Sequence, residues 1–323
     1  MIDVENLRKY FPVQKSAIEM IFSRKKEYIK AVDGVSFEIE RGEVLSLVGE
    51  SGCGKTTIGR ILVGLETPTS GKISFKGRDI TSLDKEEYRA MRRSILMVFQ
   101  DPYASLNPRM KVGEHLEDAL LVHGIASKDE AREIAKNMLD RVGLPADQFY
   151  NRMPYQLSGG QRQRVAIARA MILKPEFVVA DEPVSMIDVS LRAAILELLM
   201  SFRKEYKLSM LFITHDLSIA RLVGDRIAVM YLGKIVEIGK TRDVIYEPKH
   251  PYTAALLSSV PSFVKKPKKV EIIGDIANPL EIPPGCRYHT RCPFARKICR
   301  EVEPEMTGGK HSFACHYPLE ITF

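Results

Sequence analysis

The chain has 323 residues, of which 45% are hydrophobic and 28% charged, values that are ordinary for a globular protein. At about 150 residues per domain, this length predicts roughly two domains. Lys and Arg outnumber Asp and Glu by 48 to 41, which suits nucleic acid, an anionic membrane surface or phosphate ligands without selecting one of them. No apolar run reaches about 18 residues, the first residues lack a signal-peptide pattern, and five cysteines are an odd number. A secreted, membrane-spanning, disordered or disulfide-built protein is therefore not expected.

The segment of residues 16–30 departs from the pattern of the chain around it. It mixes the apolar Ile18, Ile21 and Phe22 with basic side chains. We expect an exposed insertion between two early strands, because solvated basic faces are common. The alternative is a basic amphipathic segment that contacts lipid headgroups.

A glycine-rich loop follows a short apolar run. Residues 44–48 predict a buried strand, and residues 57–63 predict a helix that stops at Gly64. The loop between them has the P-loop pattern Gly-x4-Gly-Lys-Thr, in which glycines let backbone N–H groups converge on phosphate oxygens. Lys55 is expected to reach the β- and γ-phosphates, and the Thr56 hydroxyl to bind Mg²⁺. The residues predicted to bind ATP here are Gly49, Glu50, Ser51, Gly52, Cys53, Gly54, Lys55, Thr56 and Thr57.

Helices and strands alternate further along the chain. A helical region extends from about 112 to 170, and within it a capping box at Ser127 opens a helix. Residues 177–180 and 210–213 predict buried strands, with a helix at 191–202 between them. Strands that alternate with helices indicate an α/β fold with a mainly parallel sheet. The face predicted to be buried on the capped helix consists of Ala131, Ile134, Ala135, Met138, Leu139 and Val142.

Two acidic residues follow the strand at 177–180. Asp181 and Glu182 lie at its C-terminal end, where open α/β sheets bind their ligands. Asp181 is expected to hold Mg²⁺, directly or through water, and Glu182 to act as general base toward the attacking water. Two acids at a strand end also suit a solvated turn, but their pairing with a P-loop favours the magnesium-nucleotide site.

The pentapeptide Leu-Ser-Gly-Gly-Gln occupies residues 157–161, before a helix predicted at 162–173. A serine hydroxyl and glycine amides at a helix N-terminus form a second cradle for phosphate. The order P-loop, pentapeptide, Asp-Glu resembles the ATP-binding cassette (ABC) family over residues 1–262. The resemblance implies the P-loop cassette fold with a β-rich subdomain and a helical subdomain at about 101–165, and ATP hydrolysis. It also implies contacts with nucleotide held by a partner subunit, made by Ser158, Gly160 and Gln161.

The same resemblance assigns roles to single residues. Gln100 matches the glutamine loop, which meets Mg²⁺ and the attacking water, and His215 matches the switch histidine at the γ-phosphate. Asp188 matches the loop that crosses to the partner subunit, although this chain has Ser-Met-Ile-Asp where the family usually has Ser-Ala-Leu-Asp. Phe11 fits the aromatic residue that stacks on adenine, and Tyr10 is the nearest rival.

A narrower resemblance is carried by residues 100–109 and 250–253, which are similar to the ATPase subunits of dipeptide and oligopeptide importers. Some transporters of this kind carry oligosaccharides or nickel instead. The resemblance implies a second ATP-binding subunit, identical or different, two membrane permease subunits and, indirectly, an extracytoplasmic substrate-binding protein. The chain would then lie peripherally on the cytoplasmic face of the membrane, with no nucleic acid expected. The alternatives are a soluble cassette ATPase acting on nucleic acid or the ribosome, and a protein of metallocluster delivery.

The composition changes near Ser262, where a lysine- and proline-rich run begins. We therefore predict a cassette domain of residues 1–262 and a Cys-rich extension of residues 263–323. Four thiols within the extension suggest metal in a cytosolic chain, but separations of five, six and fifteen residues are unspecific. A [4Fe-4S] cluster, Zn²⁺ helped by histidine (His289, His311 or His316) and unliganded or disulfide-bonded cysteines all stay open on spacing alone.

The importer resemblance favours the [4Fe-4S] cluster, because similar tails bind one. The Cys53 thiol, inside the P-loop, is expected to be incidental. The proposed cluster ligands are Cys286, Cys292, Cys299 and Cys315.

Overall fold

The structure is a computed structural model that describes residues 1–13, 27–259, 274, 278 and 280–321. Most of the predicted insertion at 16–30 and the lysine-rich run after Ser262 lie outside the described residues. The chain divides into two compact units. Unit 1 comprises Met1–Glu40, Val44–Ser82 and Ile213–Phe323, and unit 2 comprises Arg41–Glu43 and Leu83–Phe212.

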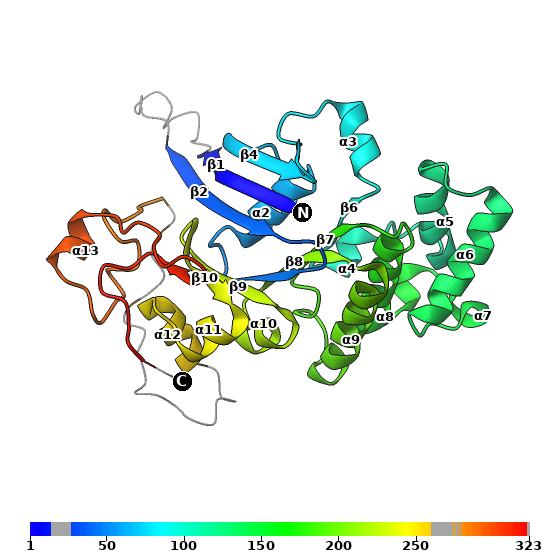
Figure 1. The fold of residues 1–323 in the computed structure, drawn as a ribbon. Helices are drawn as coiled ribbons and strands as arrows, with labels where there is room; N and C mark the ends of the chain where they lie inside the picture. Colours follow the sequence, from blue (N-terminus) through cyan, green and yellow to red (C-terminus); the bar gives the residue numbers. More distant parts are fainter. Residues whose placement is uncertain (14–26, 260–273, 275–277, 279, 322–323) are drawn as a thin grey trace, which may run out of the picture. The chain divides into compact units, whose positions relative to one another are not determined.

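Unit 1 contains an antiparallel four-stranded sheet of order β2-β1-β4-β5. Figure 1 shows β1, β2 and β4 side by side, and the polar–apolar alternation of β1 explains why one face is covered: Ile2 and Val4 are buried, while Asp3 and Glu5 are exposed. The strands are β1 (Ile2–Pro12), β2 (Tyr28–Ile39), β4 (Ser70–Phe75) and β5 (Arg78–Asp79).

A second group of strands in unit 1 is built around β3 (Val44–Val48), all five of whose residues are buried. It pairs in parallel with β9 (Arg226–Tyr231), which is antiparallel to β10 (Lys234–Lys240). The C-terminal extension adds a strand to this group, because β11 (Ser312–Phe313) pairs with β10. The helices of unit 1 are α2 (Lys55–Leu62), α10 (Leu217–Val223), α11 (Thr241–Tyr246), α12 (Pro251–Ser258) and α13 (Lys297–Glu301).

Unit 2 is mostly helical. Its strands β6 (Ile95–Val98) and β7 (Phe177–Asp181) pair in parallel, with Val98 opposite Ala180. Strand β8 (Ser209–Thr214) leads the chain back from unit 2 to unit 1. The helices are α3 (Lys85–Met91), α4 (Pro102–Ser105), α5 (Val112–Val122), α6 (Lys128–Arg141), α7 (Ala146–Phe149), the 3-10 turn Pro154–Gln156, α8 (Gly159–Met171) and α9 (Val189–Tyr206).

Helix α6 tests the predicted amphipathic face. Its capping box forms as expected, because the Ser127 N–H donates to the Glu130 carboxylate at 2.8 Å. Ala131, Ala135, Met138, Leu139 and Val142 are buried. The prediction for Ile134 is wrong, since 38% of it is exposed. It lies at the edge of the apolar stripe, where helical spacing alone decides burial poorly.

The mixed α/β fold class is confirmed, with parallel pairs in each unit and antiparallel pairs in unit 1. A separate Cys-rich domain is not confirmed, because the described part of the extension belongs to the compact unit that contains the P-loop. The physical reason is a shared core, in which Tyr288 of the extension packs on Tyr231 and Tyr252 with ring centroids 5.3 and 5.2 Å apart. The boundaries of the helical subdomain and the extension stay predictions.

Candidate functional site

The P-loop leaves β3 at Val48 and enters α2 at Lys55. Lys55 is 4% exposed, and its Nζ donates to the carbonyl oxygens of Gly49 (2.7 Å) and Glu50 (2.9 Å). The ammonium group therefore lies inside its own loop. A phosphate oxygen would offer it a charged acceptor in exchange for these carbonyls, and charge-assisted hydrogen bonds are about twice as strong as neutral ones.

Two glycines of the loop have no room for a side chain. A Cβ on Gly54 would lie 2.0 Å from the carbonyl oxygen of Ala31, and one on Gly49 would lie 2.2 Å from that of Met230. Gly54 also has φ +109°, a backbone conformation that residues with a side chain rarely adopt. The loop is thus pressed against the backbone of β2 and β9, which holds its amides in place.

Cys53 anchors the loop through its main chain. Its carbonyl oxygen accepts from the Gly233 N–H at 2.9 Å. Burial raises the pKa of its thiol, so the group is neutral at ordinary pH. Thr56 is exposed in the first turn of α2, and Thr57 is half-buried.

Gln100 and Glu182 lie together in unit 2. They follow β6 and β7, whose parallel register places both carboxyl ends at one edge. Gln100 Nε2 donates to Glu182 Oε2 at 3.2 Å. Asp181 is buried at the last position of β7, and Glu182 has φ +43°, a left-handed conformation that is costly for a non-glycine residue and typical of functional sites.

The Leu-Ser-Gly-Gly-Gln segment opens α8. The helix begins at Gly159, three residues before the predicted start. Ser158 is the N-cap: its Oγ accepts from the Gln161 N–H at 3.3 Å, and its own N–H donates to Gln161 Oε1 at 2.9 Å. Ser158 is exposed, while Gly160 is buried against Leu191 and Ile187. A hydroxyl and a helix N-terminus are groups that can bind phosphate, and the phosphate role of this segment stays a prediction.

His215 and Asp188 lie at turns that enter helices. The His215 side chain is exposed between β8 and α10, and the next residue caps α10, with Asp216 Oδ1 accepting from the Ser218 N–H at 2.7 Å. Asp188 is the exposed N-cap of α9, and its carboxylate does not cap that helix. Both residues are therefore exposed at turns that precede helices.

Tyr10 and Phe11 occupy consecutive positions of β1, so their side chains leave opposite faces of the strand. The Tyr10 hydroxyl donates to the Asp33 carboxylate, whereas the Phe11 ring lies 4.8 Å from Lys9 Nζ. The hydroxyl of Tyr10 is thus committed to an internal contact. Phe11 stays the predicted adenine-stacking residue.

The four cysteines of the extension line one pocket. All of them are free, Cys299 is buried and the other three are half-buried. Burial raises the pKa of Cys292 to about 11 and that of Cys315 to about 12, so these thiols are protonated at neutral pH. Within the described ranges, no three His, Cys, Asp or Glu side chains form a group that could hold a single metal ion. A cluster or zinc is therefore not established.

The histidines considered as zinc ligands differ in position. His289 and His316 line the same pocket. His311 is not among the residues that line it, and its Nε2 is 2.7 Å from Glu237 Oε1. Glu237 is fully buried and accepts from the backbone N–H groups of Lys249 and His250. His311 therefore contacts a buried structural carboxylate and does not line the cysteine pocket.

Comparisons with known proteins agree with the motifs. The family described as "ABC transporter" matches residues 32–185, and "Oligopeptide/dipeptide transporter, C-terminal region" matches 236–299. The chain is 45% identical to the oligopeptide transport ATP-binding protein AppF of Bacillus subtilis, over 98% of this chain and 97% of AppF. It is 44% identical to the dipeptide transport ATP-binding protein DppF of Escherichia coli, over 98% of this chain and 93% of DppF. The chain belongs to the ATP-binding subunits of oligopeptide and dipeptide ABC transporters. A dimeric structure of the ATP-binding cassette MJ0796, bound to ADP and Pi, is similar with TM-score 0.66 and 32% identity, over 75% of this chain and 99% of that one.

Membership of this ABC family makes the chain an ATP hydrolase coupled to transport. The matches give no support to the alternative of an ATPase acting on nucleic acid, the ribosome or metallocluster delivery. Among the helices that the structure describes, none combines the length and apolar character needed to cross a bilayer.

Sequence reasoning missed several residues around the P-loop of this ABC subunit. Arg291 forms an ion pair with Glu50, and the Tyr252 hydroxyl accepts from the Glu50 N–H at 3.0 Å. Arg287 forms an ion pair with Asp33. An arginine beside a cysteine carries no local signal for a partner more than 240 residues away. Tyr252 lies within residues 250–253, one of the two segments that carry the importer resemblance.

Proposed function

We propose that the chain powers the import of dipeptides or oligopeptides through separate membrane permease subunits. The observation that carries this proposal is the 44–45% identity over 98% of the chain with relatives named for oligopeptide and dipeptide transport. The similarity extends into the extension, because the family described as "Oligopeptide/dipeptide transporter, C-terminal region" matches residues 236–299. Fold alone would not separate peptides from oligosaccharides or nickel.

In the proposed hydrolysis, Lys55 binds the β- and γ-phosphates, and Glu182 takes the proton of the attacking water. The amide of Gln100, 3.2 Å from the Glu182 carboxylate, orients that carboxylate and the water. Bound Mg²⁺ would neutralise phosphate charge, with Thr56 and Asp181 as its protein ligands and Gln100 beside it. Water adds to the γ-phosphorus as its bond to the bridging oxygen breaks, which yields ADP and phosphate.

The complete site is proposed to form between two ATP-binding subunits, identical or different. The phosphate cradle of one subunit (Ser158, Gly160 and Gln161) would contact the open side of the γ-phosphate that is bound to the P-loop of the other subunit. His215 would contact that phosphate, and Asp188 would cross the dimer interface. The similar MJ0796 cassette is dimeric with ADP and Pi, and the exposed hydroxyl of Ser158 at a helix N-terminus is suited to a phosphate from outside. Closure with ATP and opening after hydrolysis would drive the two permease subunits.

The position proposed for the chain is peripheral, on the cytoplasmic face of the membrane, with a substrate-binding protein on the other side. The test is purification from membranes of the source cells, identification of attached permease subunits, and reconstitution of the complex in liposomes. ATP-dependent uptake of labelled dipeptides or oligopeptides is expected, and none by the Lys55→Ala complex. Uptake of nickel or an oligosaccharide instead would contradict the peptide proposal. ATPase activity stimulated by nucleic acid, without permeases, would contradict transport.

The proposal includes a [4Fe-4S] cluster on the four cysteines of the extension. Its support is their convergence on one pocket, where burial and neighbouring thiols raise the pKa of Cys286, Cys292 and Cys315. A four-iron cluster takes four cysteine ligands, and four thiols line this pocket. The cluster would supply a cross-link between four segments of the extension. Its ligands would be Cys286, Cys292, Cys299 and Cys315.

Anaerobic purification tests the cluster directly. Brown protein with iron and acid-labile sulfide is expected, and single Cys→Ser changes at Cys286, Cys292, Cys299 or Cys315 should each weaken iron binding. Cys53→Ser is the matched control and should keep the iron content. Stoichiometric zinc without iron would contradict the cluster.

A further inference from the structure

Two buried arginines of the extension have no part in the mechanism above. Arg287 and Arg291 are 7% and 5% exposed, and each follows or precedes a cysteine of the pocket in sequence. Arginine is almost never fully buried unless it is paired. The partners of both side chains lie in the elements that form the nucleotide site of unit 1.

Arg291 forms an ion pair with Glu50 of the P-loop. Its Nη1 and Nη2 donate to Oε2 and Oε1 of Glu50 at 2.7 and 3.0 Å. This bidentate ion pair fixes the orientation of the Glu50 carboxylate as well as its distance from the guanidinium. The hydrogen bond to Glu50 raises the pKa of Arg291 still further. The Glu50 N–H donates to the Tyr252 hydroxyl, and the Glu50 carbonyl accepts from Lys55. One loop residue is thus held at its side chain, its amide and its carbonyl.

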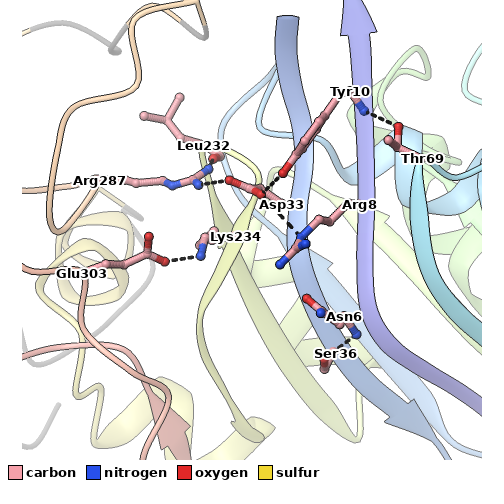
Figure 2. A network of polar contacts seen from close by, with 10 residues as sticks. All are labelled: Asn6, Arg8, Tyr10, Asp33, Ser36, Thr69, Leu232, Lys234, Arg287 and Glu303. Atoms are coloured by element: carbon pink, nitrogen blue, oxygen red, sulfur yellow. Dashed lines mark hydrogen bonds and ion pairs between the residues drawn. The ribbon is translucent and has the colours of Figure 1, made fainter.

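Arg287 contacts strand β2 and the turn between β9 and β10, as Figure 2 shows. Its guanidinium donates to the Asp33 carboxylate of β2 and to the carbonyl oxygen of Leu232. Asp33 also accepts from the Tyr10 hydroxyl of β1. Burial opposes ionisation of Asp33, but these hydrogen bonds outweigh it and lower its pKa. These contacts end at Tyr10, the residue before Phe11 in β1.

We infer that the extension positions the nucleotide site, with Arg291 acting on the P-loop through Glu50 and Arg287 acting on the β1–β2 strands through Asp33. This inference rests on the proposed phosphate-binding role of the P-loop. The physical basis is preorganisation: loop amides already fixed in their binding arrangement lose less entropy when phosphate binds. Arg291 and Arg287 are positioning residues and touch no phosphate themselves.

The experiment measures equilibrium binding of ATP to the full chain under conditions without hydrolysis. Arg291→Met removes the guanidinium, keeps an unbranched stem and leaves the Glu50 carboxylate, which is 19% exposed, without its partner. We expect affinity to fall about tenfold, in line with hydrogen bonds to charged groups. Arg291→Lys keeps the charge and should lose less. Arg300→Met, an exposed arginine of the same extension, is the matched control and should bind like the wild type.

A double substitution separates positioning from general destabilisation. If Arg291 acts through Glu50, Arg291→Met should change affinity less than about twofold in a Glu50→Gln background, because no buried charge is then left unpaired. In the single Arg291→Met variant, the KM for ATP should rise, while the binding stoichiometry and the kcat at saturating ATP should equal those of the wild type. Losses that add in the double variant, or unchanged affinity in Arg291→Met, would overturn the inference. Lys55→Ala tests the underlying proposal separately: if it binds ATP like the wild type, the P-loop assignment itself fails.

Discussion

The sharpest stability prediction concerns two glycines of the P-loop, replaced one at a time by alanine. Gly52 and Gly54 both have positive φ, +79° and +109°. A Cβ on Gly52 meets no heavy atom within 4 Å, whereas one on Gly54 lies 2.0 Å from the Ala31 carbonyl oxygen. Gly52→Ala is therefore a matched control that shares the backbone strain of Gly54→Ala and lacks its clash.

The magnitudes follow from these two terms. A left-handed conformation costs an L-residue about 1–2 kcal/mol, and this applies to both variants. A group forced into a packed site costs about 1–3 kcal/mol more. Because the obstacle beside Gly54 is backbone of β2, it cannot turn aside as a side chain could. We expect Gly52→Ala to lower the free energy of unfolding by about 1–2 kcal/mol and Gly54→Ala by about 2–5 kcal/mol.

Equilibrium unfolding in denaturant, followed by circular dichroism, measures the difference between the two variants. ATP binding should be lost more severely in Gly54→Ala, because relief of the clash moves the loop away from β2. Equal losses of stability in the two variants would refute the argument that close approach of the backbone, rather than φ alone, requires glycine at position 54.

Three further predictions test the catalytic and titratable residues. Glu182→Gln should lower the hydrolysis rate by about 10² to 10⁴ while ATP binding is kept, because the amide cannot accept the proton of water; a turnover assay near the wild-type rate would exclude Glu182 as the base. In a homodimer, Lys55→Ala and Ser158→Arg chains should each be inactive and partly regain ATPase activity when mixed, since mixed pairs collect both lesions in one site; full activity of a monomer would rule out a composite site. Burial lowers the pKa of His115, whose Nε2 lies 3.1 Å from the Asn107 carbonyl oxygen. Below about pH 6.5, the His115 imidazole therefore binds a proton in the unfolded chain but stays neutral in the folded chain. The free energy of unfolding of the wild type should fall more steeply below that pH than that of His115→Gln, and identical slopes would contradict a neutral buried imidazole.

The sequence by itself determined the features that neighbouring residues encode. The strand, loop and helix around Lys55 follow from an apolar run, glycines and a helical pattern within 20 residues, and the structure contains them. The capping box at Ser127 and the N-cap at Ser158 are likewise local hydrogen-bond arrangements, although the helix that Ser158 caps begins three residues before its predicted start. Even so, local spacing failed at Ile134, because exposure at the edge of an apolar stripe depends on what packs against it.

Tertiary structure decided which distant groups meet. Gln100 reaches Glu182 because β6 and β7 pair in parallel register, and no spacing in the sequence states that pairing. Arg291 reaches Glu50 across 241 positions because Tyr288, three residues before it, packs into the core beside β9. The cysteines of the extension converge on one pocket for the same reason. Side-chain partners this far apart depend on how the strands pair and how the core packs. Sequence separation alone does not select among possible partners, because the entropic cost of closing a long loop grows only slowly with its length.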